Sequence, residues 1–149
     1  MFRRVMLLLC VLALLASSSA CGPKAPAEIK IGVNAELTGG IPVVGASCKN
    51  AAEMAAKEVN DAGGLEVGGK KYKIVLMIED DEDKAESAAA VAQKLNTAGV
   101  LVHIGANASR NAIPASTVCE DAKLPIDQPL VHQPQDHRWQ AICLPRLLH

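Results

Sequence analysis

The length, composition and charge of the chain limit what it can be. Its 149 residues leave room for one domain, and because half of them are hydrophobic the chain falls outside the disordered class. A formal net charge of −1 provides no basic excess, so nucleic acid is not an expected partner.

Residues 1–20 have the three-part layout of a secretory signal. Arg3 and Arg4 precede an apolar run over residues 5–16, and small residues follow up to Ala20. Those twelve apolar residues are fewer than the roughly 20 that a membrane-spanning helix needs. We expect residues 1–20 to be a signal peptide for the general secretory route, and removal of its two Arg would change the net charge from −1 to −3.

Cys21 is open to two interpretations. The residues before it suit an ordinary signal peptidase, whereas a Cys directly after small residues resembles the bacterial lipobox, although Ser18 stands where lipoboxes usually carry Leu. We favour lipidation of Cys21, with residues 21–28 as a lipidated tether. The protein is then expected in the periplasm or cell envelope, attached to the membrane by its lipid.

The remaining cysteines of the exported chain are Cys48, Cys119 and Cys143, an odd number without the spacing of metal ligands. In an oxidising compartment, a disulfide between two of them is an alternative that the sequence leaves undecided. His132 and His137 lie in a segment with no predicted scaffold to fix a metal. No metal or cofactor is expected.

From Glu28 onward, short β-branched runs alternate with Ala-rich stretches, which is typical of an α/β fold. This pattern predicts a three-layer structure, with a parallel sheet and helices on both faces. Strands are expected at residues 29–35, 72–79, 100–105 and from 124, and helices at residues 47–62, 85–98 and 110–122.

Turn and charge signals separate these elements. Gly63 and Gly64 end the first helix, and residues 65–71 read as a turn. The acidic run of residues 80–83 is expected as a solvated start of the second helix, since it lacks the spaced ligands of a calcium loop. His103 alternates with apolar neighbours and is interpreted as structural.

Residues 29–126 resemble part of the first lobe of the leucine/isoleucine/valine-type binding proteins, the type I periplasmic fold of branched-chain amino-acid ABC transporters. The resemblance depends on the order of four weak motifs. They are Ile31-Gly32-Val33 with Leu37-Thr38-Gly39, the run Ala56 to Leu65, Glu79-Asp80-Asp81, and Ile104-Gly105 followed by Ser109 and Pro114-Ala115-Ser116.

The resemblance implies that the loop before the third helix binds the ligand. Ser109 corresponds to a serine whose hydroxyl holds the α-carboxylate of a small amino acid, together with backbone N–H groups near it at Asn107 and Ala108. Helix N-termini at the carboxyl edge of an open sheet suit such an anion. Ser109 could instead be only the N-cap of that helix, and residues 34–38 and 42–45 are weaker candidates on the same rim.

The chain departs from the family in two respects. Some members join the loops after the second and third strands by a disulfide, whereas Asp83 and Ala108 stand near those positions here. Members also have a second lobe that closes over the solute and supplies an acidic partner for its ammonium group, and the sequence does not encode that lobe.

Residues 127–149 show no periodic apolar pattern and are expected to be an aberrant, disordered tail. Codons can be chosen for residues 127–135 that, read one base later, encode Ile-Ser-Pro-Trp-Ser-Thr-Asn-Pro-Lys, which is similar to the family's fourth strand and next loop. We hypothesise a frameshift at or just before codon 127, which the gene sequence would test.

The leading functional hypothesis is a transporter's solute-binding component that presents an amino acid to a membrane permease. Two alternatives remain, namely a truncated, non-functional lipoprotein and a ligand-sensing regulator on the same fold. An enzyme is not expected, because residues 34–40 lack a nucleotide-binding glycine pattern and no catalytic constellation is recognisable.

Overall fold

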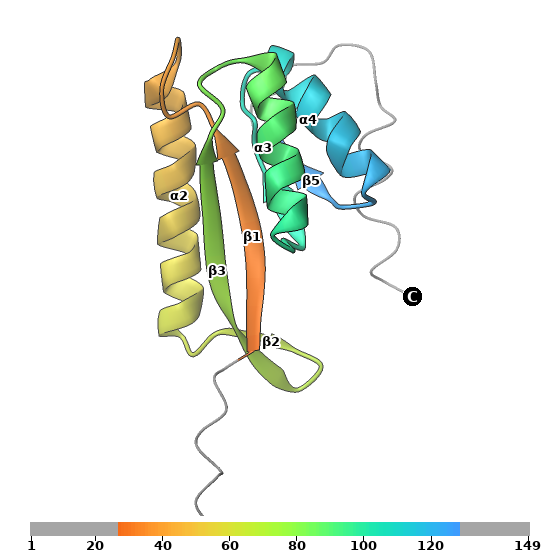
Figure 1. Ribbon diagram of the computed structural model, residues 1–149. Coiled ribbons are helices and arrows are strands. Elements are labelled where there is room, and N and C mark those ends of the chain that lie inside the picture. The colour runs from red at the N-terminus through yellow and green to blue at the C-terminus, as the bar shows by residue number, and fades with distance from the viewer. Residues whose placement is uncertain (1–26, 129–149) are drawn as a thin grey trace, which may run out of the picture.

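The computed structural model describes residues 27–128, which form a five-stranded sheet with helices on both faces (Figure 1). The elements are, in chain order, β1 (Ala27–Ala35), α2 (Pro42–Asp61), β2 (Leu65–Val67), β3 (Lys70–Asp80), α3 (Ala85–Thr97), β4 (Val102–Ile104), α4 (Ser109–Asp121) and β5 (Ile126–Asp127). None of the helices within residues 27–128 is long and apolar enough to cross a membrane. The predicted signal, tether and tail lie outside the described residues, apart from the residues next to each end.

The sheet has the strand order β2-β3-β1-β4-β5, and all its pairs are parallel except β2 with β3. In the first pair, Ile31 of β1 lies opposite Leu76 of β3, and on the other side it lies opposite Val102 of β4. In chain order, β3 is added on one side of β1, whereas β4 and β5 are added on the other side. Because crossovers between parallel strands are right-handed, this reversal places the helices on opposite faces.

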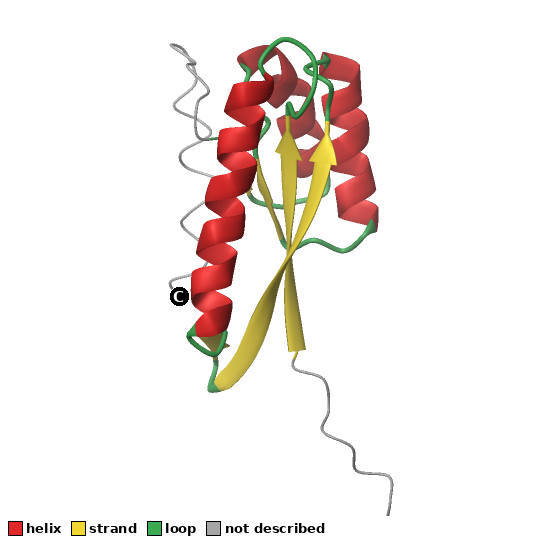
Figure 2. Cartoon of the chain, turned by 90° about the vertical axis from the view of Figure 1, so that its left-hand side faces the viewer, coloured by secondary structure: helices red, strands yellow, loops and turns green. Residues whose placement is uncertain are grey.

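Helix α2 covers one face of β1 and β3, while α3 and α4 lie together on the other face (Figures 1 and 2). The three-layer α/β arrangement predicted from the sequence is therefore confirmed.

The core is built mainly from small side chains. Val33, Ala35 and Ala52 pack between the sheet and α2, and Leu95 and Val100 are buried on the opposite face. Between α3 and α4 the buried residues are Ala88, Ala92, Ala115 and Cys119. Such small residues let the two helices approach closely, which accounts for the Ala-rich composition of α3.

Three predicted boundaries were wrong. Helix α2 begins at Pro42 instead of residue 47, since a proline fits the first turn of a helix without loss of a hydrogen bond. The predicted turn at residues 65–71 contains β2, which pairs with β3 through a hairpin at Gly68 and Gly69, both at positive φ. The last strand lies at Ile126–Asp127, two residues later than expected.

His103 is a structural side chain, as the alternation of its neighbours indicated. It is fully buried in β4, and its Nε2 lies 2.6 Å from Oδ1 of Asn96 in α3. Burial lowers the pKa of this imidazole below its usual value.

Candidate functional site

The carboxyl ends of β1, β3 and β4 lie at one end of the sheet, where their loops meet the start of α4 (Figure 2). The sequence placed its candidate residues at this rim, which is where ligands bind in open α/β sheets. Gly105 makes the close approach of the β4 loop achievable. It has a φ of +84°, and a Cβ there would collide with the carbonyl oxygen of Asn34.

Asp80, the last residue of β3, ties its loop to the loop after β1. Its Oδ1 accepts the N–H groups of Leu37 at 2.9 Å, Thr38 at 3.2 Å and Glu82 at 2.8 Å, and its Oδ2 accepts the Thr38 hydroxyl at 2.7 Å. Slight burial raises the pKa of Asp80, but these hydrogen bonds outweigh it and the pKa lies below its usual value. The rim is therefore held by an ionised carboxylate.

Glu36 ties the same β1 loop to the start of α4 and is fully buried. Its Oε1 accepts the N–H groups of Asn107 and Ala108, each at 2.9 Å, and its Oε2 accepts Nδ2 of Asn107 at 2.7 Å. Nδ2 of Asn111 adds a longer contact of 3.3 Å. Burial raises the pKa of Glu36, yet the hydrogen bonds bring it below the usual value. Sequence reasoning placed Glu36 among the weaker candidates of residues 34–38 but did not predict its burial or its bonds to α4, because a lone acid in a loop carries no signal of burial.

Asp81 and Asp83 extend this group of carboxylates, so the expectation of a solvated run was wrong for these two residues, whereas Glu82 is exposed. Asp81 is fully buried, and the side chain of Asp83 is 4% exposed. Burial, with the nearby charges of Glu36, Asp80 and Asp83, raises the pKa of Asp81 to about 6. Asp83 finds its donors on α4, whereas Asp81 accepts only the N–H of Asp83.

Asp83 and α4 make the connection that a disulfide makes in some relatives. Asp83 Oδ1 accepts Nδ2 of Asn111 at 3.0 Å, and Asp83 Oδ2 forms an ion pair with the Arg110 guanidinium. The loops after β3 and β4 are thus joined by polar contacts.

The three predicted ligand-binding residues, Asn107, Ala108 and Ser109, lie together at the rim, but they differ in their hydrogen bonds. The N–H groups of Asn107 and Ala108 are already donated to Glu36. Ser109 is the first residue of α4 and is half-buried. The alternative that Ser109 is the N-cap was wrong, since Ala108 holds that position and no side chain caps the helix locally. Within the described part of the chain, no hydrogen bond is recorded for the Ser109 hydroxyl.

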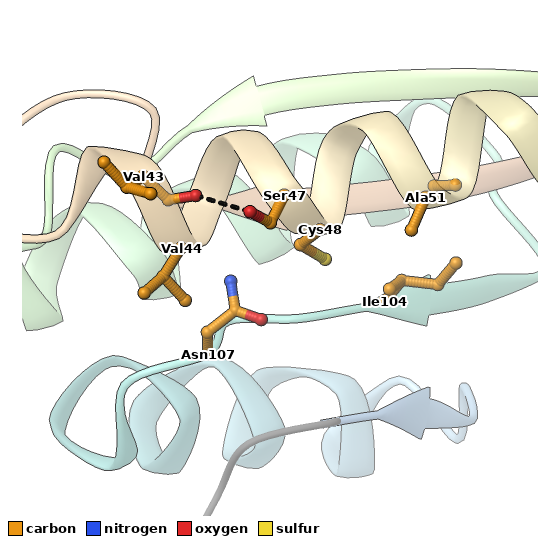
Figure 3. Close-up of a pocket in the computed structure, with 8 residues that line it drawn as sticks. Val43, Val44, Ser47, Cys48, Ala51, Ile104 and Asn107 are labelled. Carbon is orange, nitrogen blue, oxygen red and sulfur yellow. Dashed lines mark hydrogen bonds between the residues drawn. The ribbon is translucent and has the colours of Figure 1, made fainter.

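An open apolar groove of about 490 Å³ runs beside this loop, between α2 and β4 (Figure 3). Val43, Val44, Cys48 and Ala51 line it from α2, and Ile104 faces them from β4. Asn107 stands at the end nearest the rim. The groove lies where α2, which packs mainly on β1 and β3, only partly covers β4 on this face.

The cysteines of residues 27–128 are not paired with one another. Cys48 is half-buried, Cys119 is buried, and both are free thiols. Burial raises the pKa of Cys119 to about 11, so this thiol stays protonated. Over the same residues, no three side chains of the metal-ligating types gather as they would around an ion.

Comparisons with known proteins agree with this architecture. Residues 28–141, well over half of the chain, match the family model for periplasmic binding proteins. Leu/Ile/Val-binding protein homolog 1 of Brucella abortus (strain 2308) is 39% identical over 104 residues, which cover 70% of this chain and 27% of the relative. Leu/Ile/Val-binding protein BraC3 of Rhizobium johnstonii is 37% identical over 106 residues, covering 71% and 28%. The chain thus spans only about 27% of the length of such relatives.

Solved structures with the same arrangement include two with an amino acid bound. The branched-chain amino acid transporter substrate-binding protein LivJ of Streptococcus pneumoniae, in complex with isoleucine, superposes with a TM-score of 0.66 and 29% identity, over 72% of this chain and 30% of that one. A substrate-binding protein of Desulfitobacterium hafniense in complex with Leu gives a TM-score of 0.56 and 31% identity over the same shares. The chain belongs to the periplasmic binding protein family, and its described residues have the architecture of part of a type I lobe.

Proposed function

We propose that this chain is the solute-binding component of an ABC transporter, and that its loop of residues 107–109 contributes one half of a site for a branched-chain or related amino acid. The observation that carries the proposal is the position of Ser109, the first residue of α4, at the carboxyl edge of a parallel sheet. The similarity to Leu/Ile/Val-binding proteins supports the choice of solute class.

The geometry suits the carboxylate end of a zwitterion. The first N–H groups of a helix have no partner within the helix and carry a partial positive charge, so an anion is stabilised there. The half-buried Ser109 adds a hydroxyl that can donate to the same oxygen. No bond is broken in this role, so binding and release are the whole activity.

Isothermal calorimetry with leucine, isoleucine and valine tests the proposal. We expect heat with a defined stoichiometry, and Ser109→Ala should weaken binding about tenfold, since a hydrogen bond to a charged group contributes about 1.5–3 kcal/mol. Ser47→Ala, which removes an exposed hydroxyl from α2, is the matched control and should bind like the wild type. A flat trace from folded wild-type protein would contradict the proposal.

The location of the protein is part of the same proposal. We place the exported chain at the cell envelope, anchored by a lipid on Cys21 and close to a membrane permease that receives the solute. Cells supplied with labelled palmitate should yield labelled protein in the membrane fraction, and Cys21→Ala should abolish the label. An unlabelled wild-type chain would show that Cys21 is not acylated.

A second candidate is that these 149 residues alone retain no solute. The exposure of the rim favours it, because Thr38, Gly39 and Arg110 are open to solvent and a small solute there would stay largely hydrated. The calorimetry described above separates the two candidates, provided that circular dichroism shows the titrated protein to be folded.

A further inference from the structure

Glu36 is a buried carboxylate at the rim whose two oxygens are both hydrogen-bonded. It is 0% exposed, and both its carboxylate oxygens accept hydrogen bonds at 2.7–2.9 Å. Three of these bonds come from Asn107 and Ala108, more than seventy residues away along the chain. A residue at the end of β1 thus determines the conformation of the loop that leads to Ser109.

This carboxylate does for α4 what a capping side chain usually does. Ala108, at the N-cap position, has no side-chain oxygen, and α4 has no acidic residue in its first turn. Glu36 brings a negative charge to the positive end of the helix and satisfies two backbone donors next to it. Its hydrogen bonds also keep its pKa below the usual value, so it is ionised at neutral pH.

The surroundings of Glu36 keep it fixed. Asp81 and Asp83, in the loop after β3, place further negative charge beside it, and Asn111 donates both to Glu36 and to Asp83. Arg110 of α4 is the cation that pairs with this group, through Asp83. On the side of α2, Cys48 is the titratable neighbour, and the charge of Glu36 helps to raise its pKa after burial.

We infer that Glu36 is a positioning residue of the proposed solute site: by taking the N–H groups of Asn107 and Ala108 it fixes the loop and leaves a solute carboxylate to Ser109 and the helix beyond it. Two carboxylates cannot share these two N–H groups without strong repulsion. The solute carboxylate must therefore bind Ser109 without the two backbone N–H groups of Asn107 and Ala108, which the resemblance had included in the site. This inference rests on the proposed function.

Two-dimensional NMR of the ¹⁵N-labelled chain without ligand tests the first step. On acidification, the Asn107 and Ala108 amide signals should shift together, with a midpoint below that of exposed glutamates. In Glu36→Gln these two amides should exchange with solvent about tenfold faster, since both donate to Oε1 and a neutral amide oxygen accepts more weakly than a carboxylate oxygen. Glu58→Gln, on the exposed side of α2, is the control. Wild-type amides that do not titrate, or a Glu36→Gln chain with unchanged exchange, would overturn the inference.

Leucine titration of the same samples tests the second step. The Ser109 amide of the wild type should respond most strongly, Glu36→Gln should weaken the apparent affinity about fivefold or more, and Glu36→Asp, which keeps the charge, should restore part of it. Equal affinities in all three chains would overturn the positioning role. If the wild type does not respond to leucine, the proposed function fails, while the ligand-free measurements still decide whether Glu36 holds the loop.

Discussion

At the scale of single residues, Asp81 is the least satisfied ionisable group of the rim. Its Oδ1 accepts the N–H of Asp83 at 2.9 Å, but its buried Oδ2 has no partner within residues 27–128. Burial first, and then the charges of Glu36, Asp80 and Asp83, raise its pKa from 3.8 to about 6. The folded chain therefore binds a proton at a pH where the unfolded chain has already released it.

This pKa makes the stability of the chain depend on pH with a definite sign. Because the folded pKa lies above the unfolded one, the contribution of protonated Asp81 is fully present below about pH 4 and is lost as the pH rises through 6. Asp81→Asn, which mimics the neutral acid, should gain about 2 kcal/mol of unfolding free energy relative to the wild type between pH 4.5 and 7.5. Urea melts at a series of pH values measure this.

The comparison has to be a difference between variants, because His103 acts in the opposite direction. Burial lowers the pKa of His103, so its contribution is present above pH 6.5 and is lost as the pH falls through the folded value. The contribution of His103 cancels when the unfolding free energy of the wild type is subtracted from that of Asp81→Asn at each pH. A difference that stays constant from pH 4.5 to 7.5 would show that Asp81 is not the group responsible.

At the scale of elements, what the sequence could predict depended on how local each signal was. The alternation of Val, Ile and Ala predicted the strands and the helices, since burial of one face imposes that pattern. Pro42 marks the start of α2, but Val43 and Val44 are β-branched and concealed the first helical turn. Ser109 lies at the carboxyl edge of the sheet, as predicted from the sequence. The role of Glu36, which lies within the weaker candidates of residues 34–38, could not be predicted, because its donors lie far away in the sequence and a single polar residue does not reveal its partners.

Gly45 shows how tightly α2 packs on the loop that carries Glu36. It lies in the second turn of α2 and is buried, and a Cβ built there would collide with the carbonyl oxygen of Glu36 and lie 2.8 Å from its backbone nitrogen. Backbone atoms cannot move aside as the end of a side chain can. Glycine at this position is therefore required by the close approach of the two segments.

Gly45→Ala should destabilise the chain although alanine favours helices. The helical preference of alanine contributes about 1 kcal/mol in its favour, whereas overpacking against fixed backbone costs about 1–3 kcal/mol. We expect a net loss of up to about 2 kcal/mol of unfolding free energy in urea. Asn50→Ala, at an exposed position of the same helix, should instead stabilise the chain by a few tenths of a kcal/mol. Equal stabilisation by both changes would contradict the proposed packing.

At the scale of the whole molecule, the uneven cover of the sheet is the main feature that periodicity did not reveal. The sequence predicted helices on both faces, which is correct, but it gave no indication that α2 would only partly cover β4 on one face. This depends on the strand order, which results from tertiary packing. Val43, 77% exposed, and Ile104 on β4 consequently line an open apolar groove of about 490 Å³. Exposed apolar surface of this kind favours association and the binding of apolar dyes.

Val43→Ser should reduce this tendency with little effect on stability. The side chain is exposed, so its removal should change the unfolding free energy by no more than about 0.5 kcal/mol. We expect weaker fluorescence of the dye ANS and less self-association by analytical ultracentrifugation. Val67→Ser is the matched control, because Val67 is 50% exposed on the hairpin strand β2 and does not line the groove. If both variants reduced dye binding equally, the dye would be responding to exposed valines in general, and the groove would not be its site.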